Sequence, residues 1–200
     1  MRLERLSWTE KLSGPKARRP IPILSPLFRD AVIQASLNPR VRKLSFVRTL
    51  CFRGVEVPAD LLLLHGEDRV AMELLDARPL RGLDEIGMLL LALERSGSRL
   101  RQMSARDVEQ EPLLSNCRLV WNSRDAEVHR ADRHAIFAAL GQGATKLGEL
   151  RRSCGLGCET VHALMCADLI GADLSLPLND DLAIVRIRRP AVPRAASPPR

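Results

Sequence analysis

Aromatic residues are scarce in this chain of 200 residues, which has no tyrosine, four phenylalanines and two tryptophans. Aliphatic side chains must therefore fill its core. Proteins that bind single-stranded nucleic acid commonly stack successive bases on aromatic side chains. The composition offers little material for such a surface and disfavours this class of protein.

Other features are also missing from the sequence. No apolar run approaches the roughly 18 residues of a membrane-spanning helix, and the first ten residues lack the apolar middle of a signal peptide. The five cysteines are an odd number, which suits reduced thiols better than a disulfide framework. The stretch GQGATK (141–146) lacks the preceding strand and the spacing of a phosphate-binding loop. We expect an intracellular protein with no membrane partner and no evident small-molecule substrate.

What the chain has in excess is positive charge. Its net charge is +7 and its pI is about 9.8, which favours a polyanionic partner such as double-stranded DNA. Much of the excess lies in two proline-punctuated segments, residues 1–24 and 189–200. These segments are predicted to be poorly ordered, either as DNA-contacting arms or as solubilising tails. The candidate DNA-binding residues in or directly beside these segments are Arg18, Arg19, Arg188 and Arg189.

Residues 25–123 have the pattern of an α/β domain. Ser25 and Pro26 predict the start of a helix, and Asn38 and Pro39 predict its end. The expected elements are a helix (25–38), strands (41–54, 55–64 and 69–75, with a turn at 65–68), a helix (81–97), a short strand from 99 and a short helix from about 112. This order predicts a mixed sheet flanked by helices.

Residues 124–188 are expected to form a second, smaller domain. Three short helices (132–143, 145–155 and 158–171) are followed by two strands around an acidic turn at 178–181. Three short helices followed by a hairpin is the winged-helix arrangement, a variant of the helix-turn-helix.

The order of these parts resembles the TnsA-type endonuclease subunit of heteromeric transposases. The resemblance covers about residues 25–187 and is carried by the collinear stretches SPLFRDAVIQASLNPRV, VPADLLLL, RVAMELL, EPLLSNCRLV and GADLSLPLNDDLAIV. It implies a restriction-endonuclease-like domain of the PD-(D/E)xK kind followed by a winged helix. It also implies a cytoplasmic, nucleoid-associated bacterial protein that works with DNA and with transposase or other mobile-element proteins.

The same resemblance assigns a metal site to two strands. Asp60 falls on the family's first carboxylate position and Glu73 on the second, and such carboxylates hold Mg²⁺, which activates water for phosphodiester cleavage. The family's lysine position falls on Leu75, which would share the strand face of Glu73. An apolar neighbour there would raise the carboxyl pKa and weaken metal binding. The family's acid in the opening helix falls on Phe28, so two expected groups are absent.

Two interpretations of this pair remain open. In the first, the site is vestigial or weak, and Arg78 is the nearest replacement for the lysine, although arginine stays protonated and is a poor general base. In the second, which needs no family, Asp60 caps a turn and Glu73 pairs with an arginine on a solvated face of the sheet. The arginines considered for that pairing are Arg48, Arg69 and Arg78.

The cations of the second domain lie mostly on its second helix, at Lys146, Arg151 and Arg152. A winged helix usually contacts DNA through its third helix, but here that helix (158–171) has no lysine or arginine. The sequence therefore favours contact of the winged helix with a partner protein at least as much as recognition of a DNA sequence.

Cys158, His162 and Cys166 repeat every four residues in that third helix, and thiolates and imidazole are zinc ligands. A span of eight residues is about 12 Å along a helix, too long for one ion to bridge. Small cysteines buried in the core are the preferred interpretation.

Three functions are therefore considered. The leading one is a TnsA-like subunit with a degenerate nuclease domain that binds DNA ends or assembles a transposase complex, without a cofactor. The second is an active endonuclease that uses Mg²⁺ with Asp60 and Glu73. The third is a transcription regulator that binds DNA through its winged helix.

Overall fold

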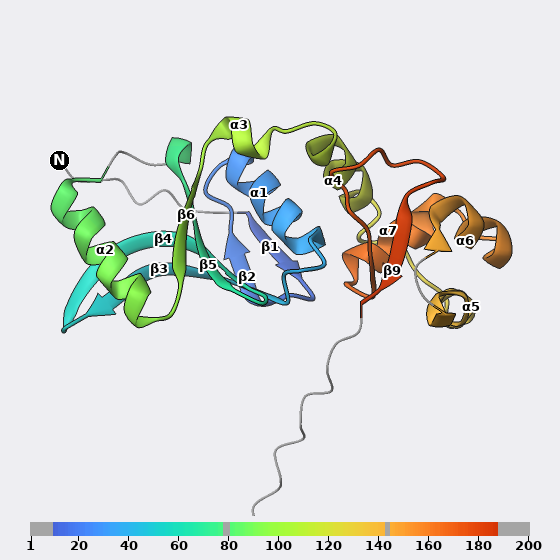
Figure 1. Cartoon of the computed structure of the whole chain (residues 1–200), viewed down its shortest axis with the longest axis horizontal. Helices are drawn as coiled ribbons and strands as arrows, with labels where there is room; N and C mark the ends of the chain where they lie inside the picture. The colour runs from blue at the N-terminus through green and yellow to red at the C-terminus, as the bar shows by residue number, and fades with distance from the viewer. Residues whose placement is uncertain (1–9, 78–80, 143–144, 188–200) are drawn as a thin grey trace, which may run out of the picture.

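The structure, a computed structural model, describes residues 10–77, 81–142 and 145–187. It is a mixed α/β protein, with a six-stranded mixed sheet and helices followed by a small three-stranded antiparallel sheet near the C-terminus (Figure 1). None of the described helices is long and apolar enough to cross a membrane.

The six strands of the large sheet lie side by side in chain order. β2 and β3 are parallel, as are β5 and β6, and the other neighbours are antiparallel. The strands are β1 (Lys11–Gly14), β2 (Ala17–Pro22), β3 (Lys43–Phe52), β4 (Val55–His65), β5 (Arg69–Leu74) and β6 (Arg99–Met103). The expected turn between β4 and β5 is confirmed.

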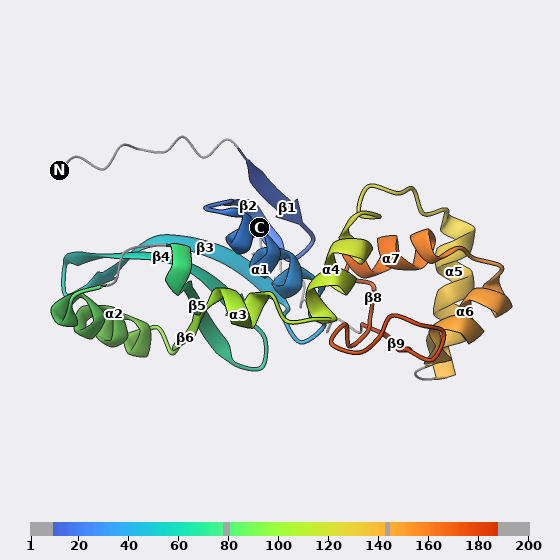
Figure 2. The same ribbon diagram turned by 90° about the horizontal axis from the view of Figure 1, so that it is seen from above.

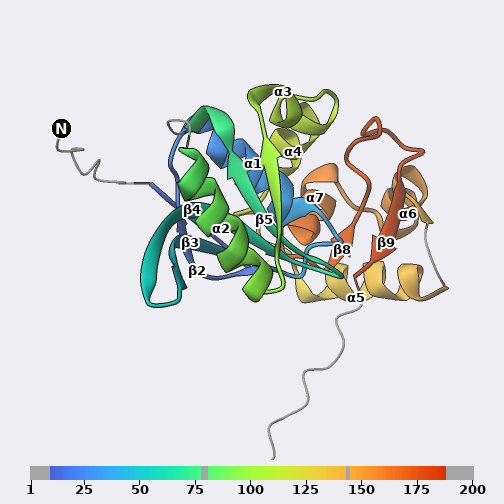
Figure 3. The same ribbon diagram turned by 60° about the vertical axis from the view of Figure 1, so that its left-hand side comes forward.

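Two helices cover opposite faces of this sheet. The cluster formed by α1 (Pro26–Leu37) contains Leu62 and Met72, whereas that formed by α2 (Leu83–Arg95) contains Leu61 and Ala71. Successive side chains of a strand point to opposite faces, so the two clusters lie on opposite sides of the sheet. Figure 3 shows α2 lying across the strands.

The start of α1 is determined by its first residues, as the sequence predicts. The Ser25 hydroxyl accepts a hydrogen bond from the Phe28 amide at 3.0 Å, and Pro26 occupies the first helical position. This cap satisfies an amide that has no partner within the helix.

The expectation of a poorly ordered arm over residues 1–24 is wrong for β1 and β2, which extend the large sheet (Figure 1). Leu12 and Ile21 are buried in the core, and burial of these side chains offsets the entropy cost of ordering a short polar segment. β2 meets β3 only at the pair Ala17–Leu44, so the prolines of β2 interrupt no long ladder.

The C-terminal part contains the three expected helices, α5 (Arg130–Ala139), α6 (Leu147–Cys154) and α7 (Cys158–Cys166). Its sheet has the order β7–β9–β8. The strands are β7 (Thr145–Lys146), β8 (Ile170–Gly171) and β9 (Ala183–Arg186). The first strand of the expected hairpin is therefore shorter and earlier than predicted, because residues 172–182 form a loop stabilised by backbone and side-chain hydrogen bonds.

The two parts of the chain share one hydrophobic core. α4 (Leu113–Trp121) packs against α1 and α7, and its Trp121 and Val120 belong to the same buried cluster as the helices on either side. Its Asn116 side chain donates to the backbone carbonyls of Leu174 and Leu176 at 3.0 and 2.8 Å. A boundary at residue 123 therefore separates two sheets but not two cores. A short helix, α3 (Ala105–Val108), precedes α4 and was not predicted.

Gly66 marks a close approach between the β4–β5 turn and the segment before β3. A β-carbon there would lie 2.4 Å from the Arg40 carbonyl oxygen. We expect Gly66→Ala to lower the free energy of unfolding by about 1–3 kcal/mol, because the backbone must shift to admit the methyl group. At Gly141 an added β-carbon meets nothing within 4 Å, so Gly141→Ala should change stability by less than about 0.5 kcal/mol. Urea titrations that find the two variants equally stable would contradict this contact.

Candidate functional site

The site begins at a bulge in β4. Val47 pairs with Leu61, but Thr49 pairs with Pro58, so Arg48 faces both Ala59 and Asp60. Asp60 has a φ of 48°, a left-handed conformation that non-glycine residues adopt rarely. Bulges of this kind re-aim a side chain and are common beside active sites.

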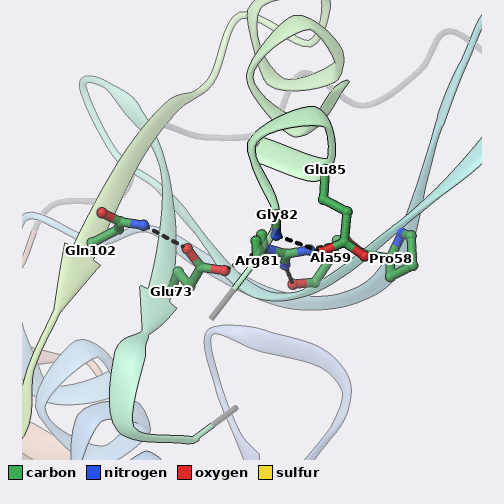
Figure 4. A network of polar contacts seen from close by, with 7 residues as sticks. All are labelled: Pro58, Ala59, Glu73, Arg81, Gly82, Glu85 and Gln102. Atoms are coloured by element: carbon green, nitrogen blue, oxygen red, sulfur yellow. Dashed lines mark hydrogen bonds and ion pairs between the residues drawn. The ribbon is translucent and has the colours of Figure 1, made fainter. Parts of the chain in front are cut away.

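Glu73 lies on the neighbouring strand and is buried. The adjacent Met72 and Leu74 pack on the α1 side, so Glu73 shares the α2 side with Ala71. Only 2% of its surface is exposed. Its Oε1 accepts a hydrogen bond from Arg81 Nε at 2.8 Å, and its Oε2 accepts one from Gln102 Nε2 at 3.0 Å (Figure 4). Both carboxylate oxygens are therefore engaged.

Arg81 connects this carboxylate to β4. Besides its bond to Glu73, it donates from Nη1 to the Pro58 carbonyl and from Nη2 to the Ala59 carbonyl, each at 2.6 Å (Figure 4). Only 3% of its side chain is exposed. A single guanidinium thus spans the space between Glu73 and the backbone that immediately precedes Asp60.

The backbone of Arg81 is fixed by the start of α2. Gly82 is the N-cap residue, and its amide donates to Glu85 Oε2 at 3.1 Å. This bond is the half of a capping box that the N3 glutamate makes, and it satisfies the N-cap amide at the helix start. The cap places Arg81 directly before the helix, with its side chain directed back over the sheet (Figure 4).

Sequence reasoning missed both Arg81 and Gln102. The expected partners of Glu73 on a solvated face were Arg48, Arg69 and Arg78, but the face is buried and Arg81, which was not among them, pairs with Glu73. Arg69 instead donates to the Ser96 carbonyl at 3.4 Å, and Arg78 lies outside the described residues. An arginine at the first position of the predicted helix (81–97) was the one available signal.

Asp60 differs from Glu73 in its surroundings. Its side chain remains accessible to water, yet partial burial raises its pKa, an effect that Arg48 and Arg81 oppose. Within the described residues it takes part in no ion pair, and no group of three histidine, cysteine, aspartate or glutamate residues there could hold a metal ion. The structure brings Asp60 and Glu73 to neighbouring strands, but within the described residues only Glu73 forms an ion pair.

Leu75 does not occupy the face of Glu73. β5 ends at Leu74, and Leu75 begins a 3-10 turn with 38% of its surface exposed. The strand predicted over residues 69–75 is therefore one residue too long, and the apolar neighbour expected beside Glu73 is absent from the described site.

Phe28, at the family's third acidic position, is a core residue. It is 1% exposed and packs edge-to-face against Phe46, with ring centroids 6.0 Å apart. Asp30 accepts two hydrogen bonds from Arg118 of α4 at 3.1 and 2.7 Å. Both residues of α1 therefore stabilise the fold.

The predicted DNA-binding cations have different surroundings. Lys146 pairs with Asp181 at 2.8 Å, and Arg151 pairs with Asp180 at 3.4 Å, so the acidic turn of the small sheet offsets their charge. Arg152 is exposed, as are Arg18 and Arg19 on β2. Arg188 and Arg189 lie outside the described residues.

Within the cysteine and histidine set of α7, His162 and Cys166 are buried, whereas Cys158 is only partly buried. Cys166 is buried and donates to the Val120 carbonyl at 3.3 Å, and burial raises the pKa of its thiol to about 12. A neutral thiol is a weak metal ligand. His162 is 5% exposed, and its Nε2 has no hydrogen-bond partner within the described residues.

His162 should make stability depend on pH. Burial, followed by the charge of Arg151, lowers its pKa below 6.5, so the unfolded chain binds a proton more readily than the folded one. We expect stability to fall as the pH drops below 6.5, by at most about 1.4 kcal/mol per pH unit from this group. Chemical denaturation at pH 7.5 and 5.5 should show a smaller loss in His162→Gln. The pKa of His65 is also lowered, but His65 is present in both proteins, so its contribution cancels in the comparison. Equal losses of stability in the unaltered protein and in His162→Gln would contradict the prediction.

The fold and site together define a mixed α/β protein with a carboxylate and a guanidinium buried between two strands and a helix start. No model of a known protein family matches the chain. Comparison with curated proteins finds no similar sequence.

Proposed function

We propose that this chain is a TnsA-like transposition subunit that does not cut DNA and that acts in DNA-end binding or in assembly of a transposase complex. Its first part would be a degenerate restriction-endonuclease-like domain and its second a winged helix. The observation that carries the proposal is the pairing of Arg81 with Glu73. The collinear resemblance and the order of helices and strands support it.

Arg81 competes with any metal ion for the oxygen ligands of this site. Mg²⁺ requires oxygen ligands, usually one or two carboxylates together with waters and phosphate oxygens. Arg81 donates to one oxygen of Glu73 and to the carbonyls of Pro58 and Ala59, so these oxygens are already bonded to a cationic side chain. Because the guanidinium stays protonated, it also repels a second positive charge at this position.

The reaction would lack a proton-transfer group as well. The family's lysine position is held by Leu75, which lies in an exposed 3-10 turn just after β5. Arg81 cannot replace the lysine as a general base because an arginine side chain stays protonated in proteins. Activation of water at this site therefore has no support from the described side chains.

A binding role fits the distribution of charge better. Arg18 and Arg19 are exposed on β2, whereas Lys146 and Arg151 are paired with acids of the small sheet's turn. Cations free of acidic neighbours release more counterions from DNA. The first domain is therefore the better candidate for contact with phosphates, and the winged helix for contact with a partner protein.

Cleavage is tested with supercoiled plasmid, the purified full-length chain, and Mg²⁺ or Mn²⁺, with and without a partner transposase. We expect no nicking by the chain itself. Nicking that requires the metal and disappears in Glu73→Ala would establish the active endonuclease instead.

Binding is tested by fluorescence anisotropy on a labelled duplex over a range of salt concentrations. We expect Arg18→Ala/Arg19→Ala to reduce the slope of log K against log salt by about 2, because each lost phosphate contact removes about 0.9. The matched double variant Arg151→Ala/Arg152→Ala should change it less. The reverse order would favour a regulator that binds DNA through its winged helix.

A further inference from the structure

α2 presents an apolar surface to solvent. Leu83, Gly87, Leu90 and Leu91 form what we call the α2 stripe, which lies within an arc of about 100° of the helix, opposite the buried Leu89. The exposed fractions of Leu83, Leu90 and Leu91 are 90%, 46% and 46%. α2 lies at the end of the molecule farthest from the C-terminal helices (Figures 1 and 2). Glu94 is exposed in the same arc at its C-terminal end, and the exposed leucines before it form the kind of apolar surface that marks interaction sites.

The shape of this surface suits another helix. A β-carbon added to Gly87 would meet nothing within 4 Å, so the stripe has a low point where a second backbone can approach closely. A hollow of about 510 Å³ lies beside the C-terminal end of α2, lined by Leu90, Leu91, Gly97 and Leu100 among others. It can receive one large aliphatic side chain.

The charges beside the stripe are self-complementary. Asp84 and Arg95 lie on the same edge of the helix, eleven positions apart, which is three turns or about 16 Å. Both are exposed, and neither takes part in the ion pairs of the described residues. If a second α2 packs antiparallel, the Asp84 of each copy faces the Arg95 of the other. The same arrangement brings each Leu83 to the hollow beside the partner's Gly97.

We propose that the α2 stripe is the contact between two copies of this chain, packed antiparallel about a two-fold axis with Leu90 and Leu91 at its centre. A two-fold contact uses the same patch on both subunits and must be complementary to itself, as this stripe is. Antiparallel helices also oppose their dipoles favourably. The inference does not depend on the proposed function.

The neighbouring edge strand is excluded as the main contact. β6 ends the six-stranded sheet, but its Arg99 and Arg101 are exposed. Pairing of two β6 strands would bring like charges together, and charged residues on an edge strand are a common protection against such pairing. The helix is therefore the contact.

The first test is the mass of the full-length chain in solution, measured by light scattering and sedimentation over a range of concentrations. We expect a dimer that dissociates on dilution, and a loss of affinity of at least tenfold in Leu90→Glu/Leu91→Glu. Leu176→Glu is the control, because Leu176 is 52% exposed on a distant loop, and it should leave the dimer unchanged. A monomer at every concentration, or a dimer that the double variant does not weaken, would overturn the proposal.

A charge exchange tests the antiparallel arrangement. Asp84→Arg alone and Arg95→Asp alone each create two like-charge contacts and should weaken the dimer on the order of tenfold. The double variant Asp84→Arg/Arg95→Asp restores opposite charges and should recover the original affinity. Failure of this recovery, with circular dichroism showing all variants folded, would contradict the arrangement.

Discussion

Replacing Arg81 with alanine is expected to lower the free energy of unfolding by about 3–5 kcal/mol, the cost of breaking a buried ion pair by removing one partner. The side chains of Arg81 and Glu73 are each 3% exposed. The substitution removes a cation that pairs with the buried carboxylate, together with donors to the carbonyls of Pro58 and Ala59. Urea denaturation at pH 7.5 measures the loss.

An exposed pair provides the matched control. Arg99 and Asp68 are paired with side chains 74% and 66% exposed, so Arg99→Ala should cost no more than about 1 kcal/mol. The double variant Arg81→Met/Glu73→Leu removes both charges and should be more stable than Arg81→Ala alone, because no buried charge remains. A loss in Arg81→Ala as small as that in Arg99→Ala would show that Arg81 does not hold the site together.

Lys16→Met is expected to have a comparable effect, about 3–5 kcal/mol. Lys16 lies between β1 and β2, and its Nζ is 3.2 Å from Asp168 Oδ1 and donates to the Asn38 carbonyl at 2.6 Å. The side chains of Lys16 and Asp168 are 1% and 4% exposed. This ion pair connects the N-terminal strands to the end of α7, so the substitution should destabilise both parts of the shared core together.

Lys146→Met is the matched control, since Lys146 and Asp181 form an exposed pair that should contribute no more than about 1 kcal/mol. Fluorescence of the tryptophans and far-ultraviolet circular dichroism should report the same denaturation midpoint for Lys16→Met if the core unfolds as one unit. Equal stability of Lys16→Met and Lys146→Met would contradict a structural role for the buried pair.

Features that depend on neighbouring residues could be predicted from the sequence. The start of α1 at Ser25 and Pro26, the turn at 65–68 and the three C-terminal helices each follow from caps, glycines and apolar periodicity within a few positions. The pairing of β4 with β5 follows from two apolar runs joined by a short turn. That proximity correctly placed Asp60 and Glu73 on neighbouring strands.

Features that depend on distant contacts could not be predicted in this way. The sequence predicted a poorly ordered arm where β1 and β2 form. Their stability comes from strand pairing and from the burial of Leu12 and Ile21 by elements later in the chain, and neither is visible in the local sequence. The bulge at Asp60 arises from a mismatch between two strands, which neither strand reveals alone. Arg81 reaches carbonyls 22 and 23 positions earlier in the chain, and this contact exists only once β4, β5 and α2 are assembled.

The most direct test of the central claim is the binding of Mn²⁺ to the full-length chain, followed by calorimetry and by the electron paramagnetic resonance of the ion. If the guanidinium of Arg81 holds the place of a cation, the unaltered protein takes up no stoichiometric Mn²⁺ at millimolar concentration. Stoichiometric uptake that Glu73→Gln abolishes would mean that the carboxylate is available to metal, and the account of a closed, non-cutting site would be wrong.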